Sequence, residues 1–116
     1  MKSKDKKILN EYVRIKLRTN YKWQCRALTR LFDDQTINER IDAISSHKNS
    51  KGFNSADAFI LSKLAMFYNK NSFLTKNQQL ILTKKLPKYS KQVIGYIDEV
   101  KQQKILGMFS NVKVTI

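Results

Sequence analysis

The sequence contains one histidine and one cysteine, the side chains that most often carry acid–base and nucleophilic chemistry. His47 stands close to Lys48 and Lys51, and such a group could supply the acid and base of a ribonuclease-like reaction. The surrounding segment is polar and rich in serine and asparagine, so a histidine in a surface loop explains the pattern more simply. With Cys25 as the single thiol, the chain lacks the usual Cys/His metal sites and fits a reducing cytoplasm.

Four acids could instead bind a divalent ion for nuclease chemistry, namely Asp33, Asp34, Glu39 and Asp42. Their spacing is not distinctive, and acids at the start of a helix explain them equally well. The sequence contains no glycine-rich loop that would hold the phosphates of a nucleotide. We therefore expect a protein that is not an enzyme and that uses no metal and no cofactor.

Positive charge dominates the composition. The 116 residues carry 23 Lys+Arg against 9 Asp+Glu, a formal net charge of +14. Residues 1–32 hold ten basic residues and two acids, and the 40 residues between Asp57 and Asp98 hold seven lysines and no acid. Segregated charge attracts polyanions, of which nucleic acid is the usual one inside a cell. No apolar run approaches the ~20 residues needed to cross a bilayer, so we expect no membrane partner.

Two basic segments supply the expected nucleic-acid contacts. In the first segment, arginines and lysines alternate with aromatic residues, a mixture that suits single strands because bases stack on rings while cations follow the phosphates. In the second, lysines lie opposite an apolar helix face. The expected binding residues are Arg14, Lys16, Arg18, Tyr21, Lys22, Arg26, Arg30, Lys84, Lys88 and Lys91.

Three residues of the first segment have alternative interpretations. Trp23 has helical spacing with Ala27 and Leu31, which favours a place in the core. Tyr21 lies one residue outside that stripe and is the better candidate for stacking. Arg26 could bind a phosphate or could pair with a nearby acid such as Asp33.

The elements that must position these residues are predicted to be helical. Glycine (3) and proline (1) are scarce, whereas an all-β domain needs many tight turns. We expect a single all-α domain, a compact bundle of about five helices over residues 8–104. Residues 1–7 read as a disordered basic tail, and residues 105–116 as a C-terminal tail with an extended end. Residues 8–17 also fit a half-buried strand, because apolar and basic residues alternate there.

Helix boundaries follow from capping signals. Two capping boxes, Thr36–Glu39 and Thr75–Gln78, predict that helices begin there, and Asn54 or Ser55 predicts another start. Pro87 predicts a kink or a new helix with the proline in its first turn. The helix that follows Ser55 is apolar nearly all round, which predicts that it is the central and most buried one.

The order of short motifs resembles an uncharacterised helical module of phage and mobile-element proteins, found alone or beside helicase and recombination domains. The motifs are "W..RAL..LF..QT..E", "GFN..DA.IL..LA" and "LT..Q....KKLPKY..Q". The matching positions are Trp23, Arg26, Ala27, Gln35, Thr36, Glu39, Gly52, Phe53, Asn54, Asp57, Ala58, Leu74, Gln78, Lys85, Tyr89 and Gln92. The resemblance implies a setting in DNA transactions, and therefore DNA rather than RNA as the partner. It also predicts that Gly52 permits a close backbone approach and that Phe53 packs inside.

We therefore expect a small nucleic-acid-binding protein, a phage-encoded accessory in DNA replication, recombination or repair, acting in the host cytoplasm. An alternative is a phage-encoded inhibitor or adaptor that binds a host enzyme complex, for example a CRISPR or transcription complex. An exposed apolar patch would favour that alternative. The segment "GMFSNVKVTI" is its candidate, with Met108 and Phe109 at its start.

Overall fold

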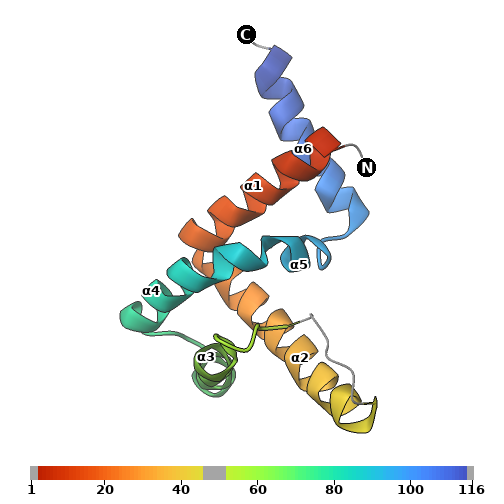
Figure 1. Cartoon of the computed structure of the whole chain (residues 1–116). Coiled ribbons are helices and arrows are strands. Elements are labelled where there is room, and N and C mark those ends of the chain that lie inside the picture. The colour runs from red at the N-terminus through yellow and green to blue at the C-terminus, as the bar shows by residue number, and fades with distance from the viewer. Residues whose placement is uncertain (1–2, 46–51, 115–116) are drawn as a thin grey trace.

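Every regular element in the described residues is helical, as predicted. The computed structural model describes residues 3–45 and 52–114, and side chains for residues 3–35 and 52–109. In chain order the elements are α1 (Ser3–Thr19), α2 (Tyr21–Ser45), α3 (Ala58–Asn71), α4 (Lys76–Lys85), the 3₁₀-helix η1 (Leu86–Tyr89), α5 (Ser90–Ile94) and α6 (Glu99–Val114) (Figure 1). Because α4, η1 and α5 follow one another without a break, the fold consists of five helical segments.

Both ends of the described chain are helical beyond the predicted limits. Helix α1 begins at Ser3, so residues 3–7 are helical and do not belong to a disordered tail. Helix α6 continues to Val114, so residues 105–114 are helical as well, and the expected extended end does not form there. The two ends support each other, because Leu9 of α1 packs against Ile105 and Leu106 of α6. Contacts between residues so far apart leave no local signal in the sequence.

Helix α2 is continuous through the expected start at Thr36. It runs from Tyr21 to Ser45, so the predicted helix boundary at the Thr36–Glu39 capping box is wrong. No glycine or proline interrupts this stretch. Each residue added to an existing helix gains a backbone hydrogen bond without a new nucleation cost, which outweighs a local capping preference.

The centre of the bundle is α1 rather than α3. Helix α1 packs against α2, α4, η1, α5 and α6, whereas α3 packs chiefly against α2 and lies at one edge (Figure 1). Only one face of α3 is buried, through Leu61, Leu64 and Ala65. Phe59 and Met66 on its other face are 72% and 52% exposed. The prediction that this helix is the most buried is therefore wrong.

The second half of the chain confirms two capping predictions. The Thr75 side chain accepts a hydrogen bond from the Gln78 backbone N–H, and the Gln78 side chain accepts one from the Thr75 N–H. Pro87 lies in the first turn of η1, so a new helical turn begins at this point. That turn buries Leu86 and Tyr89 against the main core.

Candidate nucleic-acid interface

Three of the predicted cations share one face of α2. The inner face of this helix is fixed by Leu28 and Leu31, which are fully buried. Lys22, Arg26 and Arg30 recur every four residues on the outer side, and all three are exposed. Asn20 caps the start of this helix, since its side chain accepts a hydrogen bond from the Trp23 backbone N–H at 3.1 Å. The cap fixes where this row of cations begins.

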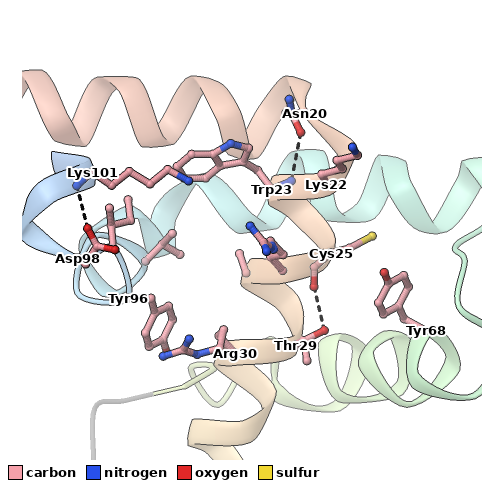
Figure 2. Close-up of a pocket in the computed structure, with 14 residues that line it drawn as sticks. Asn20, Lys22, Trp23, Cys25, Thr29, Arg30, Tyr68, Tyr96, Asp98 and Lys101 are labelled. Carbon is pink, nitrogen blue, oxygen red and sulfur yellow. Dashed lines mark hydrogen bonds between the residues drawn. The ribbon is translucent and has the colours of Figure 1, made fainter. Parts of the chain in front are cut away.

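This face of α2 forms the floor of a cleft of about 620 Å³. Tyr68 of α3 lies on one side of the floor, and the segment from Tyr96 to Lys101 lies on the other (Figure 2). Four cations line the cleft, and Asp98 is its one carboxylate among the described residues. The lining cations are Lys22, Arg26, Arg30 and Lys101. The cleft is therefore strongly electropositive.

Asp98 offsets only one of the four positive charges, and its side chain caps the start of α6. Its carboxylate accepts a hydrogen bond from the Lys101 backbone N–H at 2.8 Å. A carboxylate at this position satisfies an otherwise unpaired N–H group and the positive end of the helix dipole. The Lys101 side chain meanwhile extends across the cleft toward α2 (Figure 2).

Two aromatic rings in the cleft lie beneath cations. The Lys101 ammonium lies 5.2 Å from the centre of the Trp23 ring, and the Arg30 guanidinium lies 4.6 Å from that of Tyr96. Both rings are half-buried. The Tyr96 hydroxyl donates a hydrogen bond to Asp34. Burial and this bond to a carboxylate raise the pKa of Tyr96 well above its usual value, so the hydroxyl stays protonated.

Only one of the three predicted cations of α1 faces this side. The Lys16 ammonium lies 5.4 Å from the centre of the Tyr12 ring, which makes an edge-to-face contact with Trp23. Lys16 therefore extends the basic surface of the cleft along α1. Arg14 and Arg18 are exposed, but each lies about 160° around the helix from Lys16. The expected single group of N-terminal cations is thus divided between two faces.

The Tyr21 ring remains exposed (36%), while its hydroxyl is engaged inside the fold. Its hydroxyl accepts a hydrogen bond from the Leu74 backbone N–H at 2.9 Å, which holds the start of α2 to the loop before α4. Trp23, assigned to the core from its spacing, is the ring that lines the cleft. The sequence also gave no sign of Lys101 or Tyr96, which lie some seventy residues from α2 in the chain. Trp23 and Tyr96 are therefore further candidates for stacking, beside Tyr21.

The second predicted cation group does not form one free strip. Lys84, Lys88 and Lys91 are exposed but belong to three different elements, α4, η1 and α5. The Lys88 ammonium forms an ion pair with the Asp57 carboxylate, which Lys85 also contacts at 3.1 Å. Lys88 therefore has a carboxylate partner within the protein, although about half of its side chain is exposed, and it is not the free phosphate contact that was expected.

Asp57 is the buried centre of this second cluster, with 2% of its surface exposed. Burial alone raises the pKa of its carboxyl. Hydrogen bonds from Lys88, Tyr89 and Lys85 outweigh that effect and lower the pKa from 3.8 to about 2. The Tyr89 hydroxyl donates to Asp57 at 2.8 Å and accepts from the Asn54 N–H at 3.0 Å. Asp57 therefore remains ionised, although it lies within the fold.

Further bonds join the same two segments. The Gln92 amide accepts from the Gly52 N–H at 2.7 Å and donates to the Gly52 carbonyl at 3.1 Å. Phe53 is buried and makes an edge-to-face contact with Tyr89. We call residues 52–57 together with residues 85–92 the Asp57 clasp. The predicted inward packing of Phe53 is confirmed, and Gln92 has a structural role in the same contact.

Gly52 is required by the geometry of this clasp. Its φ is +84°, a conformation that side chains disfavour. A Cβ atom at this position would lie 2.9 Å from the Gln35 backbone. The predicted close approach is confirmed. The "GFN" and "KKLPKY" motifs meet in space here, and the contacts between them join distant parts of the fold.

Neither of the catalytic candidates can be assembled from the described residues. Glu39, Asp42 and His47 lie outside the residues with described side chains. Within the described part, no group of three or more His, Cys, Asp and Glu residues could hold a metal ion. In the same part of the chain, no helix has the length and apolar character that a bilayer crossing requires.

No protein-family model, curated protein or solved structure matches this chain. The resemblance to a phage module therefore stays a prediction.

Proposed function

We propose that this chain is a small, non-enzymatic nucleic-acid-binding protein that binds mainly through the phosphate backbone. The observation that carries the proposal is the cleft along α2, where Lys22, Arg26, Arg30 and Lys101 converge. None of these four side chains has a carboxylate partner among the described residues. Their charge is therefore available to a ligand.

The net charge of +14 supports the same partner. A long-range positive field accelerates the encounter with a polyanion, and the cleft supplies close contacts once the two have met. Phosphate contacts carry little sequence information, so we expect weak sequence preference. We further propose, from the resemblance alone, that the protein is a phage-encoded accessory in DNA replication, recombination or repair, and that it acts in the host cytoplasm.

A salt titration tests this proposal. Four phosphate contacts predict that log K falls with log[salt] with a slope of about −3 to −3.5, or about 50- to 150-fold weaker binding between 50 and 200 mM salt. The measurement is fluorescence anisotropy of labelled DNA and RNA oligonucleotides at both salt concentrations. Absence of binding in dilute buffer would reject the proposal. Stronger binding of RNA than DNA would reject the DNA setting alone.

A second function is favoured by the exposed apolar face of α3. Phe59 and Met66 lie seven residues apart and so share a face, with Lys63 beside them, 4.5 Å above the Phe59 ring. Exposed apolar groups of this kind are common at protein interfaces. The candidate at residues 107–116 is only partly described: Met108 is exposed, and Phe109 packs edge-to-face on the Tyr12 ring.

This alternative is an inhibitor or adaptor of a host enzyme complex, and a pull-down can separate it from the first proposal. The bait is the full chain, with a Phe59→Ser/Met66→Ser variant as its control and a nuclease-treated host lysate as the source. A partner that survives nuclease and is lost with the variant would support the alternative. Partners that disappear after nuclease treatment were held by nucleic acid, which would contradict it.

A further inference from the structure

The aromatic rings of the cleft bear on which form of nucleic acid fits. Trp23, Tyr68 and Tyr96 are half-buried and line the cleft together with its cations. A duplex hides the faces of its bases in the stack and presents backbone and groove edges. Rings set in a basic groove are therefore of little use to a duplex, whereas unstacked bases of a single strand can lie against them.

The shape of the cleft also favours a single strand over a duplex. A helix that reads duplex DNA must project into a major groove about 12 Å wide. The basic face of α2 is instead recessed between Tyr68 of α3 and the Tyr96–Lys101 segment (Figure 2). A volume of about 620 Å³ lies in the range of sites that take small ligands. Individual nucleotides can enter such a space, but a double helix cannot.

The cations above the rings are arranged so that a strand can displace them. Lys101 covers Trp23, and Arg30 covers Tyr96, at 5.2 and 4.6 Å from the ring centres. Lys101 is exposed, so its ammonium is held weakly above the Trp23 ring, whereas a stacked base and a phosphate contact are each stronger. When a strand binds, Lys101 can move from the Trp23 ring to a phosphate while a base takes its place. The Arg30 guanidinium can stay, because its plane also stacks on bases.

We infer that the cleft is a site for single-stranded nucleic acid, with bases against Trp23 and Tyr96 and phosphates along α2. Lys22, Arg26 and Arg30 recur about every 6 Å along the helix, so they can follow consecutive phosphates of one strand. This inference rests on the proposed function, since a protein that binds no nucleic acid has no use for either form.

The single tryptophan of the chain gives a direct readout, because Trp23 itself lines the cleft. We would titrate the full protein with a 12-nucleotide oligothymidine and with a mixed-sequence duplex of the same length, at 50 mM salt. Binding is followed by anisotropy and by Trp23 fluorescence. We expect at least tenfold tighter binding of the single strand, with quenching of the fluorescence by the stacked base.

The possible results distinguish the single-strand inference from nucleic-acid binding itself. If the duplex binds as tightly as the single strand and leaves Trp23 fluorescence unchanged, the single-strand inference is overturned and nucleic-acid binding stands. If neither oligonucleotide binds, both claims are rejected. If the single strand binds with no change in Trp23 fluorescence, stacking on Trp23 is rejected.

A matched pair of variants isolates the second ring. Tyr96→Leu removes the ring, whereas Tyr96→Phe keeps it and removes only the hydrogen bond to Asp34. We expect Tyr96→Leu to weaken single-strand binding about 5- to 150-fold, as for the loss of one base–ring stack, and Tyr96→Phe, which keeps the ring, to weaken it much less. Circular dichroism confirms that each variant is folded. Equal weakening in both variants would show that the hydrogen bond matters and would overturn the stacking role.

Discussion

The cleft and the Asp57 clasp contain the same types of side chain but use them for different purposes. Each contains lysines beside a tyrosine, and in the sequence Lys22 and Lys88 look alike. In the cleft, Lys22 has no carboxylate partner among the described residues. In the clasp, Lys88 is paired with a buried acid more than thirty residues earlier in the chain. Whether a lysine serves binding or stability is decided by the acid that it meets in space.

The two regions also differ in what their rings do. In the clasp, the Tyr89 ring is buried and its hydroxyl links Asn54 to Asp57. In the cleft, the rings of Trp23 and Tyr96 stay half-buried, each beneath a cation. A buried hydrogen-bonded ring strengthens the fold, whereas a partly open ring is free to meet a ligand. Substitutions should therefore sort cleanly into those that alter binding and those that alter stability.

The largest effect is expected from charge reversal in the cleft. The double variant Lys22→Glu/Arg26→Glu replaces two phosphate contacts with repulsion. We expect affinity for a single-stranded oligonucleotide to fall about 100-fold, or about 2.8 kcal/mol, and the salt slope to become shallower. Because both residues are exposed and lack partners in the described structure, the free energy of unfolding should change by less than about 0.5 kcal/mol. Anisotropy and urea unfolding measure the two quantities.

A matched control removes the same charge from another surface. Lys63 and Lys70 are exposed on α3, about 140° and 160° around the helix from Tyr68, which lines the cleft. The variant Lys63→Glu/Lys70→Glu should weaken binding several-fold through the lower net charge alone. Equal losses in the two double variants would mean that total charge, rather than the cleft, determines binding.

The next effect concerns the centre of the clasp. Asp57→Asn keeps the shape of the side chain but removes its charge from Lys85, Lys88 and Tyr89. The pKa of Asp57 falls from 3.8 to about 2 on folding, which corresponds to about 2 kcal/mol of stability. At pH 7 we expect the free energy of unfolding to fall by about 2 kcal/mol and the melting temperature to fall by about 10 °C. Oligonucleotide affinity of the folded variant should not change.

The stability that Asp57 contributes should depend on pH in a definite direction. A depressed pKa stabilises the fold fully above pH 3.8, and the contribution is lost as the pH falls toward 2. The difference in free energy of unfolding between Asp57→Asn and the parent protein should therefore be large at pH 6 and nearly zero at pH 2. Asp33→Asn, at an exposed position, should show no such gap. A gap that is the same at both pH values would contradict the ionised clasp.

Local signals predicted the parts of the fold that depend on neighbours in the chain. The scarcity of glycine and proline, the Thr75–Gln78 capping box and Pro87 gave the helical class and two boundaries correctly. The local signals failed where contacts with distant segments determine the structure. Helix α6 is stabilised against Leu9 at the other end of the chain, and the row of buried residues in α1 makes that helix the centre.

The candidate site could be predicted only in part, for the same reason. The four-residue spacing of Lys22, Arg26 and Arg30 places these cations on one face of any helix. Lys101 reaches that face only through the packing of α6, which no local pattern encodes. Gln24 is another residue whose role depends on segments distant in the chain. It is fully buried because its amide donates to the Leu17 carbonyl and to Thr83, and so joins α1, α2 and α4.

The smallest predicted effect compares two lysines of the segment that were predicted to be equivalent. Lys88→Gln removes an ion pair to Asp57, but about half of the Lys88 side chain is exposed, so water screens the pair. We expect a loss of only about 0.5–1 kcal/mol in the free energy of unfolding, because Lys85 still partners the carboxylate. Lys84→Gln, with no partner in the described structure, should leave stability unchanged. Urea unfolding at low and high salt measures both, and the Lys88 effect should shrink as salt rises. If the two variants lost stability equally, the ion pair would contribute nothing beyond the helix itself, and the distinction between a paired and an unpaired lysine would fail.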